Sequence, residues 1–321
     1  TGLVTGISKG DATIIVTADD FSSNPVSASC EIGVKIVTPI TGMTFTEDTE
    51  LNQLGYGQEY QIKYTLEPVD ATASLLTWAS DNPEVISVDK TGKLKVHTTK
   101  TASAVITASY GPVVQNVTVT VADGRFWYSL GNGLGNGLDN NWYLDGNNAS
   151  VVSSDGNKTT VQMGSGYRGD LWLARSGKGK IVNVTPADYR YFAIKVGFKS
   201  QLVPGKNKPN GCIKLEIFDD GIKKIGPEYF GTGGDANNRY EILGASEIST
   251  TEPNVLYYDL QSKYKTVTPT DWNQVFDLVQ CKFVIADFPE TAQTYDLYWI
   301  RSFKSIEELQ AFVDSENNTN E

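Results

Sequence analysis

The segment Thr91–Ala108, TGKLKVHTTKTASAVITA, decides how the first third of the chain is interpreted, because an earlier segment repeats it. At a constant offset of 90 residues, without a gap, it matches Thr1–Ala18, TGLVTGISKGDATIIVTA. The identical pairs are Thr1/Thr91, Gly2/Gly92, Ala12/Ala102, Thr17/Thr107 and Ala18/Ala108. A repeat this long exceeds the period of solenoid proteins and predicts tandem β-sandwich domains.

The complete copy of the repeat runs from about Pro39 to Val121. Short alternating stretches such as YQIKYTL (Tyr60–Leu66) predict strands, and EPVD and DNP predict the turns between them. Three segments of this copy resemble the bacterial immunoglobulin-like domain of the group 2 type: EPVDAT (67–72), LTWASDNPEV (76–85) and VDKTG (88–92). The resemblance implies a sandwich used as a spacer or adhesive module on surface proteins, with Trp78 in its core and His97 at its surface. We therefore expect residues 1–38 to be the C-terminal part of one immunoglobulin-like domain and residues 39–122 to be a second.

From Asp123 onward the repeat stops but strand patterns continue. In Tyr191–Phe198, YFAIKVGF, apolar side chains alternate and share one face. Further strands are expected at 254–260, 279–286 and 295–303, and no segment before Ser305 has helical periodicity. The chain is therefore predicted to be all-β, with residues 123–305 forming a larger jelly-roll sandwich.

Residues 306–321 follow a different pattern. Ile306, Leu309 and Phe312 fall at helical spacing, with Glu307 and Glu308 near the start. We expect a short terminal helix here, followed by a disordered polar tail from Ser315 to Glu321.

The composition excludes several classes of function. A net charge of −11 without clustered Lys and Arg argues against nucleic-acid binding. The single histidine, His97, rules out a multi-histidine zinc site and, outside the repeat, a Ser-His-Asp triad. Cys212 and Cys281 fall in strand-like runs, and this pattern is compatible with a disulfide or with two buried thiols.

A catalytic carboxylate pair is not evident. Sandwich-fold glucanases carry Glu-x-Asp-x-x-Glu, which places carboxylates on one strand face. In EIFDDG (216–221), Glu216 and Asp219 differ by three and point to opposite faces of a strand. We expect no enzyme and no cofactor, although the turn at Asp219 and Asp220 is compatible with a structural calcium ion.

Aromatic side chains are the remaining candidates for binding. Gly124–Leu144, GRFWYSLGNGLGNGLDNNWYL, is interpreted as a glycine-rich loop that presents Trp142 and Tyr143 to a ligand. The alternative is that Trp127 and Trp142 plug the ends of a sandwich core.

A second candidate segment is GSGYRGDLWLAR (164–175). If Leu171 and Leu173 face the core, Trp172 points out of it, either toward a ligand or under a long loop or neighbouring domain. A third loop lies around residues 231–238. Together, these segments give the candidate ligand-binding residues Trp142, Tyr143, Tyr167, Arg168, Asp170, Trp172, Tyr229 and Arg239.

The end of this domain, YWIRSFKSIEEL (298–309), and its place after the repeats are similar to the galactose-binding-like jelly rolls of Bacteroidetes surface glycan-binding lipoproteins. The resemblance implies noncatalytic capture of a polysaccharide at the cell surface, beside an outer-membrane glycan importer. It also implies an N-terminal lipid anchor outside this chain as the membrane attachment. Two alternatives remain open: an adhesin that recognises host protein, and a glycoside hydrolase or lyase.

Overall fold

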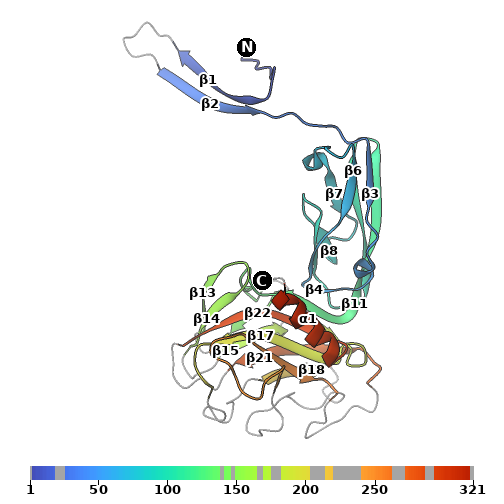
Figure 1. Cartoon of the computed structure of the whole chain (residues 1–321), viewed down its shortest axis with the longest axis vertical. Coiled ribbons are helices and arrows are strands. Elements are labelled where there is room, and N and C mark those ends of the chain that lie inside the picture. The colour runs from blue at the N-terminus through green and yellow to red at the C-terminus, as the bar shows by residue number, and fades with distance from the viewer. Residues whose placement is uncertain are drawn as a thin grey trace.

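The computed structural model describes residues 2–18, 26–137, 141–145, 149–164, 169–174, 182–202, 214–219, 240–261, 272–285 and 293–318. Figure 1 shows three parts in chain order: an N-terminal two-stranded ribbon, a middle sandwich and a larger terminal sandwich. Most of the regular structure is β-strand, so the predicted all-β class is confirmed. No helix among these residues is long and apolar enough to cross a membrane.

The middle sandwich surrounds a core that includes Leu54, Ile86 and Ile106, each fully buried. One sheet has the strand order β7-β10-β11-β4, and β5-β9-β8 and β3-β6 form smaller sheets. Its elements are β3 (Gly42–Phe45), η1 (Thr49–Asn52), β4 (Leu54–Tyr56), β5 (Glu59–Gln61), β6 (Tyr64–Glu67), η2 (Ala73–Leu75), β7 (Thr77–Ser80), β8 (Ile86–Val88), β9 (Lys93–Val96), β10 (Ala102–Tyr110) and the first part of β11 (Val113–Ser129).

The prediction of one strand over Tyr60–Leu66 is wrong. The segment is split between β5, which pairs with β9, and β6, which pairs with β3. Between them the side chain of Ile62 is buried in the core of the middle sandwich. The chain therefore changes its pairing partner at this point, which residue alternation alone does not reveal.

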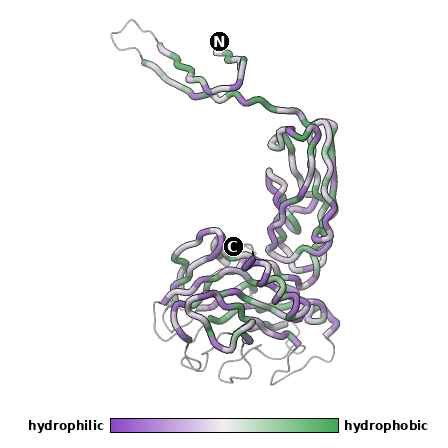
Figure 2. The backbone as a smooth tube through the Cα atoms, in the orientation of Figure 1, coloured by the Kyte–Doolittle hydropathy of each residue, from purple (hydrophilic) through white to green (hydrophobic). Residues whose placement is uncertain are grey.

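The N-terminal ribbon consists of β1 (Gly10–Ala18) and β2 (Val26–Val34), which among the described residues pair only with each other. It corresponds to the hairpin β10–β11 at the offset of the sequence repeat. Val16 is 66 % exposed, whereas the matching Ile106 is 0 % exposed. The ribbon thus displays apolar residues that the equivalent hairpin buries, and Figure 2 shows these hydrophobic stretches away from both sandwiches.

The terminal sandwich contains two sheets with a large apolar core between them. One has the order β19-β20-β17-β22-β11, with β14 and β13 beside β22; the other has the order β12-β15-β21-β16, with β18 beside β21. The elements after β11 are β12 (Tyr143–Asp145), β13 (Ser150–Ser154), β14 (Thr159–Gln162), β15 (Gly169–Ala174), β16 (Val182–Val184), β17 (Tyr191–Phe198), β18 (Lys214–Asp219), β19 (Glu241–Ile242), β20 (Asn254–Asp259), β21 (Phe276–Ile285), β22 (Thr294–Phe303) and α1 (Ile306–Asn318).

The predicted alternation of β17 is confirmed, since Phe192, Ile194 and Val196 all lie in the core between the sheets. The interpretation of Gly124–Leu144 as one loop is wrong in its first part. β11 continues to Ser129 and pairs there with β22, so the chain passes from one sandwich to the other within a strand.

Helix α1 covers the outer face of the first sheet. Ser305 accepts a hydrogen bond from the Glu308 amide at 3.2 Å and so begins the helix. Leu309 is fully buried, and Phe312 packs on Trp299, with ring centroids 5.6 Å apart. The terminal helix is confirmed, but the prediction of disorder is wrong for residues 315–318, because the helix continues to Asn318; residues 319–321 lie outside the described residues.

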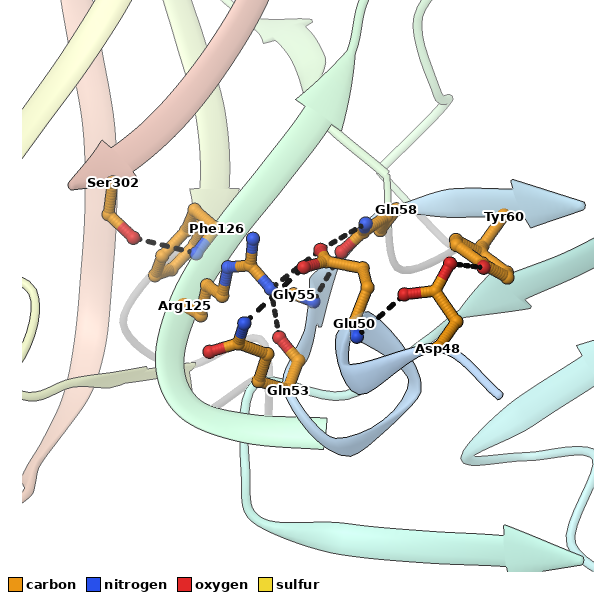
Figure 3. A network of polar contacts seen from close by, with 9 residues as sticks. All are labelled: Asp48, Glu50, Gln53, Gly55, Gln58, Tyr60, Arg125, Phe126 and Ser302. Atoms are coloured by element: carbon orange, nitrogen blue, oxygen red, sulfur yellow. Dashed lines mark hydrogen bonds and ion pairs between the residues drawn. The ribbon is translucent and has the colours of Figure 1, made fainter. Parts of the chain in front are cut away.

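A network of polar contacts joins the two sandwiches (Figure 3). The Arg125 guanidinium lies 2.9 Å from the Glu50 carboxylate and also donates to the Gln53 carbonyl. Tyr56 of β4 belongs to the core of the terminal sandwich, where it contacts Phe126, with ring centroids 5.7 Å apart. Apolar and polar contacts therefore both cross the junction, while each sandwich keeps its own hydrophobic core.

Candidate functional site

The candidate site lies on the outer face of the sheet formed by β12, β15 and β21, in the part of the terminal sandwich farther from the middle sandwich (Figure 1). Strand register places Tyr143 opposite Trp172, and Trp172 opposite Lys282. Residues directly opposite one another in antiparallel strands point to the same face. These three side chains therefore form one row across the sheet.

The alternation predicted for β15 is confirmed. Leu171 and Leu173 lie in the core between the sheets, whereas Trp172 belongs to no core cluster. Asp170 also lies on the outer face, beside the row. We refer to Tyr143, Asp170, Trp172 and Lys282 together as the Trp172 site.

An ion pair organises this site. The Lys282 ammonium lies 2.9 Å from the Asp170 carboxylate, and both side chains are nearly buried, at 8 % and 7 % exposed. The same nitrogen lies 4.3 Å from the centre of the Trp172 ring. Removing two charges from water is costly unless they are well paired, and an ammonium over an indole face gains further attraction. The lysine therefore fixes the indole and the carboxylate relative to each other.

The core beneath the Trp172 site is also closely packed. Gly169 in β15 leaves room for Tyr295 of the opposite sheet, since a Cβ at position 169 would lie 3.0 Å from the tyrosine hydroxyl. Burial first, and then the charge of Asp170, raise the pKa of Tyr295. Its hydroxyl therefore remains protonated at neutral pH.

Of the eight ligand-binding residues predicted from the sequence, three are brought together, one is buried in the core and four lie outside the described residues. Tyr143, Asp170 and Trp172 are brought together, and their role as ligand contacts stays a prediction. Tyr143 is half-buried, while Trp172 is only 8 % exposed, so the expectation of a solvent-facing indole is wrong. The candidates outside the described residues are Tyr167, Arg168, Tyr229 and Arg239.

Trp142 is not a surface residue. Its side chain is 0 % exposed and packs near Phe283, with ring centroids 5.7 Å apart, so the expectation that a loop presents it to a ligand is wrong. The alternative, a tryptophan that plugs the sandwich core, is confirmed. Tyr143 lies opposite Trp172 on the outer face, whereas the preceding Trp142 lies in the core between the sheets.

Lys282 was missed from the sequence. It lies between Cys281 and Phe283, both fully buried. A charged residue between two apolar residues of a strand is a usable signal, because an unpaired lysine is rarely accommodated there. Its partners could not be named from the sequence, since they lie more than 100 residues earlier in the chain.

Of the residues predicted to hold calcium or to form a disulfide, Asp219 is the last residue of β18 and Cys281 lies in β21, whereas Asp220 and Cys212 lie outside the described residues. Cys281 is a free buried thiol whose pKa burial raises, while Cys212 lies in an undescribed segment. In the part of the chain that the structure describes, no three His, Cys, Asp or Glu side chains are grouped to hold a metal ion.

A small pocket lies where the two sandwiches meet. It has a volume of about 100 Å³ and is lined by Glu59 and Lys95 of the middle sandwich and by Tyr128 and Asn141 of the terminal one. The Tyr128 hydroxyl donates to the Asn141 side-chain carbonyl at 2.7 Å. The volume is below the roughly 300 Å³ typical of small-molecule sites, so this pocket is a weaker candidate.

A family model described as Domain of unknown function (DUF4979) matches residues 133–309, more than half of the chain. The chain belongs to this family. The DUF4979 region begins in the turn after β11, ends within α1, and contains every member of the Trp172 site. No curated protein matches the sequence.

Several solved structures are also similar to the chain, and three of them are as follows. The M60 catalytic domain with CBM51-1 and CBM51-2 of Clostridium perfringens ZmpB is 13 % identical, with a TM-score of 0.23, covering 91 % of this chain and 25 % of that one. The secreted serine protease VesC of Vibrio cholerae is 10 % identical, with a TM-score of 0.23, covering 82 % of this chain and 51 % of that one. The structure of the CBM51-2 and INT domains of ZmpB is 11 % identical, with a TM-score of 0.20, covering 81 % of this chain and 48 % of that one. The chain thus spans a quarter to about half of these structures, and likeness at such TM-scores carries no argument about function.

Proposed function

We propose that this protein is a noncatalytic cell-surface polysaccharide-binding protein that captures glycan for a neighbouring outer-membrane uptake system. The observation that supports it is the Trp172 site, in which an indole, a phenol, a carboxylate and an ammonium share one outer sheet face. Sugar rings offer C–H faces to aromatic rings and hydroxyls to charged groups. Tyr143, half-buried at the end of the row, is the ring that a sugar would contact.

We further propose that residues 1–38 and 39–122 belong to two immunoglobulin-like domains that hold a terminal jelly roll, residues 123–305, away from the membrane. The match between the N-terminal ribbon and hairpin β10–β11 supports the repeat. Attachment to the outer membrane through an N-terminal lipid anchor, and the importer as partner, are parts of the same proposal. No cofactor is required in it.

Affinity electrophoresis against a panel of neutral and acidic polysaccharides tests this function, with a reducing-end assay on the same mixtures. We expect retardation by at least one polysaccharide, no new reducing ends, and no effect of EDTA. New reducing ends would identify a hydrolase or lyase instead. A chain that no polysaccharide retards would contradict capture and favour the adhesin.

The site itself is tested by Tyr143→Ala. Losing one ring from the sugar contact should weaken binding about tenfold, equivalent to about 1.4 kcal/mol. Tyr191→Ala is the matched control, because Tyr191 is also half-buried on an outer face of this sandwich, where it contacts Tyr257 and Arg190. Equal retardation of the two variants would place the sugar contact elsewhere.

A further inference from the structure

The middle sandwich has an open groove that the Trp172 site does not include. Its volume is about 440 Å³, within the range of roughly 300–1,000 Å³ found for small-ligand pockets. It exists because β3 ends at Phe45 and the chain then crosses through η1 to the other sheet. β4 pairs with β11 only from Leu54 opposite Val121, which leaves a space beside Gln115–Thr118.

The floor of this groove is apolar and rigid. Phe45 stacks on Trp78, with ring centroids 5.9 Å apart, and Leu51 is only 5 % exposed. Val117 completes the floor from β11. These side chains are anchored in the core of the middle sandwich, so a ligand would meet a preformed apolar surface.

The rim of the groove is polar and uncharged over most of its length. Thr46, Asn52, Gln115 and Thr118 are among the residues that line it. In the part of the chain that the structure describes, none of these four side chains makes a hydrogen bond to the protein. Hydroxyl and amide groups that face a groove without competing partners are suited to the hydroxyls of a sugar.

One carboxylate at the rim is held in place. Asp48 accepts hydrogen bonds from the Tyr60 hydroxyl at 2.5 Å, from the Glu50 amide at 3.0 Å and from the Lys63 ammonium at 3.0 Å. These bonds, led by that of Tyr60, lower the pKa of Asp48 to about 2. Lys63 offsets the charge of Asp48, so Glu47 leaves a net negative charge at the groove that disfavours acidic ligands.

We propose that this groove binds a segment of a neutral glycan, as a second carbohydrate contact on the spacer. The apolar floor faces a sugar ring, the hydroxyl and amide groups bind its hydroxyls, and the net negative charge disfavours uronate chains. A second contact on one polymer strengthens capture through effective concentration, without new contacts at the first. The groove is a separate site, so this inference does not depend on sugar binding at the Trp172 site.

The test is a titration of the full chain followed by backbone amide NMR. The probes are maltohexaose, cellohexaose, xylohexaose and mannohexaose as neutral chains, and hexagalacturonic acid as the acidic one. We expect one neutral probe to shift amides of residues 44–52 and 115–118, with hexagalacturonic acid leaving them unchanged. The combined variant Asn52→Ala and Gln115→Ala should reduce the affinity at the groove about tenfold. Asn82→Ala, an exposed amide on a turn outside the groove, is the control and should have no effect.

The possible results of this titration distinguish binding at the groove from binding at the Trp172 site. Groove shifts that survive Tyr143→Ala support the inference even if the Trp172 site binds nothing. Shifts confined to β12, β15 and β21 overturn it while leaving the proposed function intact. Shifts nowhere in the chain overturn it, as does a groove response to hexagalacturonic acid equal to that of the neutral probes.

Discussion

Both outer faces of the terminal sandwich hold a cation against a tryptophan ring. The first is the face that helix α1 covers, and the second is the face that carries the Trp172 site. On the first, the Arg301 guanidinium lies 4.4 Å from the Trp127 ring and 4.2 Å from the Phe312 ring, with Glu316 nearby. On the second, Lys282 lies over Trp172 and pairs with Asp170.

The difference lies in what closes each face. Helix α1 supplies both Phe312 and Glu316, so the first cluster is completed by a separate element packed on the sheet. The second cluster is built within adjacent strands, and among the described residues no helix packs over it. A cation over an indole is therefore not in itself a sign of a binding site. The first face is part of the hydrophobic interior, whereas the second has Tyr143, which is half-buried, at its edge.

The largest expected effect is that of Trp299→Ala on the helix-covered face. Trp299 is 3 % exposed and donates to Glu316 at 3.1 Å, so its loss should cost about 3–5 kcal/mol of unfolding free energy. Polysaccharide retardation should be unchanged. Trp172→Ala should cost less, since Trp172 belongs to no core cluster, and should weaken retardation. Equal stability losses with retardation intact in both variants would make the two faces alike.

The next effect concerns the ion pair. Lys282→Met leaves Asp170 nearly buried without its ammonium, which should cost about 3 kcal/mol in urea unfolding. The double variant Lys282→Met with Asp170→Asn should recover much of that loss, because no unpaired charge remains. If the double variant were as unstable as the single one, the pair would not be what holds the site together.

A smaller effect is expected at the helix. Glu316→Gln weakens contacts with Lys195, Trp299 and Arg301, which should cost about 1–2 kcal/mol. Burial lowers the pKa of Arg301 to about 10, so it remains charged at neutral pH and still needs a counter-charge. The measurement is the thermal unfolding midpoint, with Gln310→Ala on the exposed side of α1 as control. A midpoint shift as large in the control would contradict a specific role for Glu316.

The smallest effect is a pH dependence beside the helix-covered face. Burial alone would raise the pKa of Asp296, but hydrogen bonds from Lys158, Lys199 and Thr160 outweigh it and hold the pKa below its ordinary value. A carboxyl whose folded-state pKa is lowered contributes stability that is complete above its unfolded pKa of about 3.9. That contribution disappears as the pH falls through the lowered folded-state pKa. The stability difference between the wild type and Asp296→Asn should therefore shrink below about pH 4, and a constant difference would contradict it.

Part of the candidate site and the terminal helix could be predicted because each depends on residues that are close together in the sequence. Alternation along β15 placed Trp172 opposite to Leu171 and Leu173, and the spacing of Leu309 and Phe312 predicted α1. Both patterns depend only on the geometry of one strand or one helix. The pairing of Trp172 with Lys282 was not available in this way, since it depends on which distant strands become neighbours.

The sequence by itself determined the all-β class, the internal repeat, the core face of β17 and the outward side of Trp172. Only the tertiary structure decided that Trp142 is buried, that β11 passes through both sandwiches, and that Lys282 lies over the indole. The physical reason is that a period of two residues fixes the side on which a residue lies. Burial and partnership are fixed by long-range strand pairing and by what packs on each face.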